Sequence, residues 1–205
     1  MRLFRYSATA MCIVMMTGCA SMPSMPQMKH ADNQQPQAVS SNKSRIVFMR
    51  SSNIGSVFNP SLYDVTQEEP VFIGILPNWG RLVYDTTPGE HTFMVVSEAA
   101  DFMKANMSAG KTYYSIATPR FGVSVARFSL APIRNDGITP GNTDPTRIED
   151  MKTRTKLLSN TDETKEWFKN NVGDIRAKQA KYWRNWQQKS LSELADVTLD
   201  PQDGE

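Results

Sequence analysis

His91 is the residue best suited to acid–base chemistry, because it is one of only two histidines in the 205-residue chain and lies in a strongly patterned segment. An imidazole changes its protonation state near neutral pH, so a hydrolase would have to be built around it. A hydrolytic triad also needs a hydroxyl nucleophile, and no Gly-x-Ser-x-Gly turn occurs near His91. The sequence therefore favours a structural role for His91, and a hydrolase centred on it is the least favoured interpretation.

A second group of residues could bind a soft metal. Met22, Met25 and Met28 recur at every third position and His30 follows them. Thioethers combined with an imidazole are ligands that Cu(I) prefers. A short tract of this kind is equally typical of a methionine-containing spacer. Binding of Cu(I) or of a small ligand is therefore an alternative function, and the sequence predicts no resident cofactor.

The two cysteines, Cys12 and Cys19, both lie in the first twenty residues. The rest of the chain can therefore have no disulfide, thiol nucleophile or cysteine metal site. Two arginines precede an apolar run from Ala8 to Met16, which is shorter than the ~20 residues that a membrane-spanning helix needs. This arrangement is typical of a secretion signal.

Residues 16–19 read Met-Thr-Gly-Cys, which resembles the bacterial lipoprotein cleavage box. The resemblance implies that residues 1–18 are a lipoprotein signal peptide and that Cys19 becomes the acylated N-terminus. Two or three acyl chains hold a domain on a membrane far more firmly than one chain. Ala20, in place of an aspartate, implies export to the outer membrane, with the body facing the periplasm.

The charge balance argues against a nucleic-acid partner. Removal of the signal peptide takes away Arg2 and Arg5 and leaves 21 basic against 21 acidic residues. A protein that binds nucleic acid through its phosphates carries an excess of positive charge, which the mature chain lacks.

Residues 19–43 are predicted to be a disordered, lipidated tether. This segment contains prolines, glutamines and serines, and no aromatic residue, leucine or isoleucine. Such a composition cannot bury enough apolar surface to fold. A flexible coil of this length has a root-mean-square span of ~27 Å and extends to about 80 Å.

Residues 44–134 are predicted to form an antiparallel β-sandwich of seven to eight strands, because short β-branched and aromatic runs alternate with turn residues. Residues 77–80 are expected to close a hairpin between the third and fourth strands, and Thr87–Glu90 a type II turn with Gly89 at positive φ. Alternation predicts that three pairs of side chains point into one core: Leu82 with Tyr84, Phe93 with Val95, and Tyr114 with Ile116.

The same segment contains a Pro-Gly-x-His turn and a later Gly-x-x-Tyr-Tyr strand. These motifs comprise Pro88, Gly89, His91, Gly110, Tyr113 and Tyr114. They resemble those of a family of bacterial lipoproteins of uncharacterised function, whose domain is a small sandwich related to PEGA-type modules. The resemblance covers residues 44–134 and implies a fold and an envelope location, without an activity.

The C-terminal third is predicted to be helical. Residues 135–145 form a loop, and the helical region spans 146–199, ahead of a tail at 200–205. A short helix is expected from Pro145 to about Leu158. A long helix is expected to follow, with Asn160 as its N-cap and Glu163 at the third helical position.

The long helix carries a mixed aromatic and basic stretch, and its members are Tyr182, Trp183, Trp186, Lys181 and Arg184. The aromatic stripe can pack on the sandwich and leave the cations in water. Alternatively, the stretch can contact an envelope protein or an anionic lipid surface. Together these features favour a lipid-anchored, non-enzymatic binding or scaffolding protein of the cell envelope.

Overall fold

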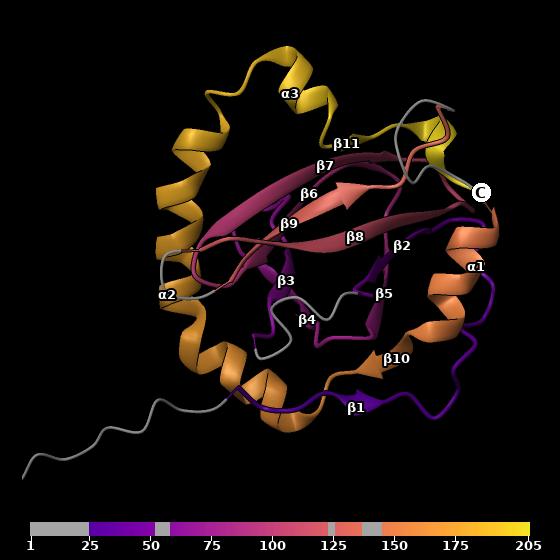
Figure 1. Cartoon of the computed structure of the whole chain (residues 1–205), viewed down its shortest axis with the longest axis horizontal. Helices are drawn as coiled ribbons and strands as arrows, with labels where there is room; N and C mark the ends of the chain where they lie inside the picture. Colours follow the sequence, from indigo (N-terminus) through magenta and orange to yellow (C-terminus); the bar gives the residue numbers. More distant parts are fainter. Residues whose placement is uncertain (1–24, 52–57, 123–125, 137–144) are drawn as a thin grey trace, which may run out of the picture.

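The computed structural model describes residues 25–51, 58–122, 126–136 and 145–205. Eleven strands lie in two sheets, with three α-helices and one 3-10 turn after the ninth strand (Figure 1). The strands are β1 (Lys29–His30), β2 (Ser44–Met49), β3 (Ser61–Asp64), β4 (Val71–Ile75), β5 (Gly80–Thr86), β6 (Gly89–Val96), β7 (Ala100–Met107), β8 (Thr112–Arg120), β9 (Arg127–Pro132), β10 (Lys156–Ser159) and β11 (Thr198–Leu199). The helices are α1 (Pro145–Arg154), α2 (Asp162–Trp186) and α3 (Leu191–Ala195), and the 3-10 turn is η1 (Pro201–Asp203).

The predicted sandwich with C-terminal helices is confirmed, but its sheets are mixed rather than antiparallel. The first sheet has the order β1-β10-β5-β2-β8-β9, and the second has the order β11-β7-β6-β3-β4. Three neighbouring pairs run parallel: β2 with β8, β10 with β5, and β11 with β7. Two of these pairs use strands from the C-terminal third, where the sequence predicted only helix.

The turns also join the sheets differently from the prediction. The hairpin expected at residues 77–80 is wrong, because β4 lies in the second sheet and β5 in the first. The segment is instead a crossover in which Trp79 has φ 58°. The turn before β6 is a second crossover, and the positive φ predicted for Gly89 is confirmed at 118°.

The core has three apolar layers. The inner layer lies between the sheets and includes Phe48, Leu82 and Phe93. The second layer lies on the outer face of the second sheet, under α2. The third lies on the outer face of the first sheet, under α1, and contains Tyr114 and Ile116. Those two side chains therefore point away from the core to which alternation assigned them, and Tyr113 and Ala117 occupy it instead.

The predicted tether is wrong for residues 25–43, which lie on the body. β1 pairs antiparallel with β10, so that His30 is opposite Leu158. Met28 packs against the inner layer, and its sulfur accepts a hydrogen bond from the Ile75 N–H at 3.5 Å. A side chain at position 74 would lie 3.0 Å from the Met28 methyl carbon, so Met28 fills the space that Gly74 leaves open. Residues 19–24 lie outside the described part of the chain.

The C-terminal third also departs from the prediction. The first helix ends at Arg154 and β10 follows, because Leu157 and Leu158 are buried on the sheet. The N-cap of α2 is Thr161, which exchanges hydrogen bonds with Thr164, rather than the predicted Asn160 with Glu163. The Asn160 side chain donates to the Ile73 carbonyl at 2.9 Å.

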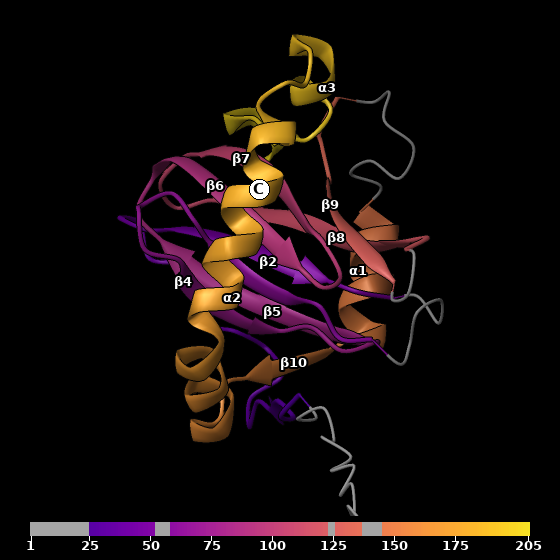
Figure 2. The same ribbon diagram turned by 90° about the vertical axis from the view of Figure 1, so that its left-hand side faces the viewer.

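The long helix stops at Trp186, well before Leu199. Ser190 starts α3 with a capping box to Glu193, and β11 then joins the second sheet. The predicted tail is part of the fold as well, because the Glu205 backbone pairs with Thr112 in both directions at 2.8 and 3.1 Å. Figure 2 shows α2 lying along the outer face of the second sheet, with α3 beyond its end.

Replacement of Met28 by alanine tests whether the N-terminal segment belongs to the body. We expect Met28→Ala to lower the free energy of unfolding by about 2 kcal/mol, because it removes buried packing. His30→Ala is the matched control: this side chain is exposed on the same strand, and its loss should change stability by less than about 0.5 kcal/mol. Urea unfolding of both variants measures the difference, and equal stabilities would show that the segment does not pack as described.

Candidate functional site

The candidate functional site is a pocket of about 510 Å³ on the outer face of the first sheet. Three parts of the chain enclose it: the sheet itself, α1, and residues 34–39, which we call the strap. Val47 and Val83 form an apolar floor, and polar side chains form the walls. The charged side chains lining the described pocket are Arg45, Arg81, Lys152, Lys156 and Glu149.

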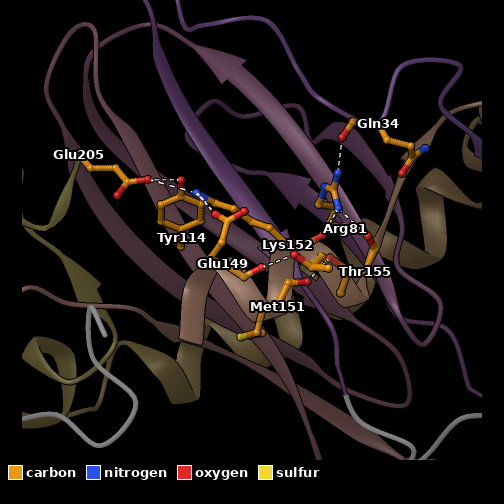
Figure 3. A network of polar contacts seen from close by, with 9 residues as sticks. Gln34, Arg81, Tyr114, Glu149, Met151, Lys152, Thr155 and Glu205 are labelled. Carbon is orange, nitrogen blue, oxygen red and sulfur yellow. Dashed lines mark hydrogen bonds and ion pairs between the residues drawn. The ribbon is translucent and has the colours of Figure 1, made fainter. Parts of the chain in front are cut away.

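Arg81 joins the walls of this pocket. Its guanidinium donates to the carbonyls of Lys152 and Thr155, both at 2.5 Å, and to the carbonyl of Gln34 (Figure 3). Lys152 lies in the last turn of α1, Thr155 directly follows α1, and Gln34 starts the strap. The Arg81 side chain therefore connects both α1 and the strap to β5. Burial lowers the pKa of Arg81, and no carboxylate lies within 4 Å of its guanidinium among the described residues.

Arg45 holds the strap at its other end. Its guanidinium forms a two-point ion pair with Asp85 at 2.6 and 2.7 Å and also donates to the Gln37 carbonyl. The hydrogen bonds that Arg45 donates to Asp85 raise the pKa of Arg45 against the opposite effect of burial. Two-point pairs of this kind fix direction as well as charge, so the strap has a defined position across the sheet.

Tyr114 lies at the third side of the pocket. Its hydroxyl donates to the Glu205 carboxylate at 2.5 Å, and the Lys152 ammonium lies 4.7 Å from the centre of its ring (Figure 3). Lys152 also pairs with Glu205 at 3.3 Å and with Glu149 at 3.9 Å. Burial raises the pKa of the Tyr114 hydroxyl, and the Glu205 carboxylate raises it further, so the phenol stays neutral.

This arrangement can bind a small anionic group, because the exposed Lys156 and the spare N–H groups of Arg45 and Arg81 lie around an apolar floor. It offers no pairing of a nucleophile with a free base among its described side chains. Sequence reasoning missed the pocket, since its polar residues gave no recognisable motif.

His91, the residue best suited to catalysis from its sequence context, lies elsewhere and is buried. Its Nδ1 lies 3.0 Å from an Asp64 carboxylate oxygen, and its Nε2 lies 2.8 Å from the Thr87 carbonyl. Thr66 contributes a hydroxyl 3.2 Å from Nδ1. A hydroxyl and a carboxylate therefore do approach His91. Both ring nitrogens have oxygen partners, and through them the ring links Asp64 to the Thr87 carbonyl at the start of the turn around Pro88 and Gly89.

The two partners of this pair have opposite pKa shifts. Burial lowers the pKa of His91, but the hydrogen bonds to Asp64 and Thr87 outweigh it, so the net shift is upward. Burial raises the pKa of Asp64, but the hydrogen bonds from His91 and Thr66 outweigh it, so the net shift is downward. The folded state therefore favours a charged pair.

The predicted soft-metal ligands do not share one position. Met28 packs against the core, His30 is exposed on β1, and Met25 lines a different cavity, beside α2. Met22 lies outside the described residues, as does the predicted acylation site Cys19. Among the described residues, no group of three or more His, Cys, Asp and Glu side chains could hold a metal ion. Copper binding by these methionines stays a prediction, and it would require Met28 to leave its partner.

The aromatic residues predicted to face a partner instead cover the second sheet. Trp183 and Trp186 stack at 5.0 Å, and both contact Phe102 edge-on at 4.9 and 5.9 Å. Tyr182 packs against the same layer, whereas Lys181 and Arg184 are exposed. The structure thus matches the sheet-packed alternative for the aromatic stripe and leaves only the cations facing outward.

Comparison of the chain with family models, with curated proteins and with solved structures found no match in any of the three. No helix in the described ranges combines the length and the apolar character that crossing a membrane requires. The function must therefore be argued from the chain's own residues.

Replacement of Arg81 tests the network around the pocket. Arg81→Met leaves the carbonyls of Gln34, Lys152 and Thr155 without their donor, so we expect the free energy of unfolding to fall by about 3 kcal/mol. Lys156→Met is the matched control, since this exposed cation lines the same pocket and should change stability by less than about 0.5 kcal/mol. Chemical denaturation measures both, and a small effect of Arg81→Met would contradict its role in joining α1 and the strap.

The His91–Asp64 pair predicts a pH dependence of stability. Because the pKa of His91 is raised by folding, the contribution of His91 is complete below its ordinary value of about 6.5 and is lost as the pH rises through the folded-state pKa. The contribution of Asp64, whose pKa is lowered, is complete above about pH 4 and is lost as the pH falls further.

We therefore expect His91→Gln to cost about 3 kcal/mol near pH 5.5 and less at alkaline pH, as measured by denaturant unfolding across the pH range. His30→Gln, which alters an exposed histidine, should leave the profile unchanged. A wild-type profile that stays flat above pH 6.5 would contradict the charged pair.

Proposed function

We propose that the protein is a lipid-anchored, non-enzymatic binding module of the cell envelope, held at the outer membrane and facing the periplasm. The Met-Thr-Gly-Cys sequence at residues 16–19 supports acylation of Cys19, and Ala20 supports the outer membrane as the destination. Because the acylated N-terminus is held in the membrane, the folded body is the part of the chain that meets a ligand or partner.

The observation that carries this proposal is the short distance between the anchor and the body. The body begins by Met25, which lines a cavity beside α2, and the half-buried Met28 packs against the core. Cys19 is six positions before Met25. Six residues span at most about 20 Å, so an acylated Cys19 holds the body close to the lipid surface. A module positioned in this way acts at the membrane rather than at a distance from it.

A binding role also fits the chemistry of the polar groups. The pocket under the strap has cations around an apolar floor, an arrangement suited to recognition. His91 and Tyr114 are both committed to hydrogen bonds that hold segments together. These commitments support a module that binds rather than one that transfers protons.

Metabolic labelling with a palmitate analogue tests the anchor. We expect the wild-type protein to incorporate label and to fractionate with membranes, and Cys19→Ser to lose both properties because it lacks the thiol that is acylated. Cys12→Ser is the matched control, since this cysteine lies in the predicted signal peptide and should leave labelling unchanged. Absence of label from the wild type, or labelling that survives Cys19→Ser, would overturn the proposed function.

A further inference from the structure

Acidic and basic residues are distributed unevenly along α2. All four acidic residues of α2 lie in its first half: Asp162, Glu163, Glu166 and Asp174. No acidic residue occurs from position 175 to position 192. The helix therefore changes from mixed charge to purely basic charge along its length.

The cations in the two halves also differ in their pairing. In the first half, Lys165 pairs with Asp162 at 3.3 Å, and Lys169 pairs with Glu166 at 3.7 Å. In the second half, Arg176 pairs with Glu69. Lys181 and Arg184 are exposed, and neither has a carboxylate within 4 Å among the described residues. Their charge is therefore available to an external anion.

The aromatic side chains determine which way this charge faces. Trp183 and Trp186 are held against Phe102 on the second sheet, so this side of α2 is covered. Lys181 and Arg184, three positions apart, lie on the side that remains in solvent. Figure 2 shows this side of α2 without any described segment in front of it.

The start of the body lies next to the same helix. Met25 lines a cavity of about 820 Å³ together with Asn171, Asp174 and Lys178 of α2. Those helix positions follow one another at intervals of three or four, and Lys181 is the next position in that series. Glu98 and Asp174 lie close enough to Lys178 to act on its charge, so Lys178 is not counted as available.

We propose that the basic face of α2, centred on Lys181 and Arg184, rests on anionic phospholipid headgroups of the membrane that holds Cys19. Lys189 lies at the edge of this face, close enough to Glu193 for the two charges to interact, and is not counted as available. The inference rests on the proposed function, because Met25 is six positions after Cys19 and so lies within about 20 Å of that surface, next to α2. The basic face and the anionic headgroups have complementary charges.

The energetics explain why the anchor and the surface act together. Each Lys or Arg near an anionic membrane strengthens binding by about five-fold, so Lys181 and Arg184 together give roughly 25-fold. This is too weak to recruit a free protein firmly. A short connection between the acylated Cys19 and the body raises the effective concentration of the lipid surface to about the millimolar range. A weak contact is then sufficient to orient the body.

Lysine footprinting on vesicles tests the orientation. Cys19 is the only cysteine in residues 19–205, so a maleimide phospholipid can attach that stretch to vesicles of phosphatidylcholine, with or without about a third phosphatidylglycerol. We expect acetylation of Lys181 to slow several-fold on the anionic vesicles only, and to recover in about 0.5 M salt. Lys156 is the internal control and should react equally on both vesicles, because it lines the pocket beside α1. Figure 1 shows α1 and α2 on opposite sides of the body.

Charge reversal provides the matched variants. With Lys181→Glu and Arg184→Glu combined, protection of Lys189 should disappear, whereas Lys165→Glu combined with Lys169→Glu should leave it intact. Equal acetylation of Lys181 on neutral and anionic vesicles would overturn the inference. Protection that persists on neutral vesicles would also overturn it, by indicating contact between protein copies. Because the chemical anchor replaces natural acylation, this experiment fails or succeeds independently of palmitate labelling.

Discussion

The structure depends on the need to bury apolar side chains on both faces of both sheets. In β2, Ile46 and Phe48 face the inner layer while Val47 and Met49 face outward, and all four are buried. A sheet with two apolar faces requires a cover on its outer side. The first sheet receives α1, and the second receives α2 with its tryptophans. This constraint places the aromatic stripe of α2 against the second sheet and leaves Lys181 and Arg184 exposed.

Much of the sandwich could be predicted, because alternation and turn residues are local signals. The strands around Leu82 and Phe93 and the positive φ of Gly89 follow from neighbouring residues alone. The predictions that were wrong depend on contacts between residues far apart in the sequence. Tyr114 was assigned to the wrong layer, because β2 and β8 have apolar residues at both parities and the pattern gives no preferred face. The parallel strand pairs could not be predicted either, because the direction of neighbouring strands depends on connections between distant segments.

The candidate pocket could not be predicted for the same reason. Arg81 contacts carbonyls that are 47, 71 and 74 positions away, and Tyr114 contacts Glu205 at a separation of 91. Composition also misled the prediction for residues 25–43. Met28, the two-residue strand β1 and hydrogen bonds from Arg81 and Arg45 attach this polar segment to the body. The predicted acylation at Cys19 rests on a local motif, which is why sequence alone could suggest it.

The proposed anchor and the proposed membrane contact form one geometry: a short connection from Cys19 to a body that begins beside α2, and a basic face directed at the lipid. Neutron reflectometry of the protein coupled through Cys19 to a supported anionic bilayer tests this geometry most directly. The account predicts that the protein layer begins within about 20 Å of the headgroups, since six extended residues reach no further. A water layer of several tens of ångströms between lipid and protein, as a free tether would produce, would contradict it.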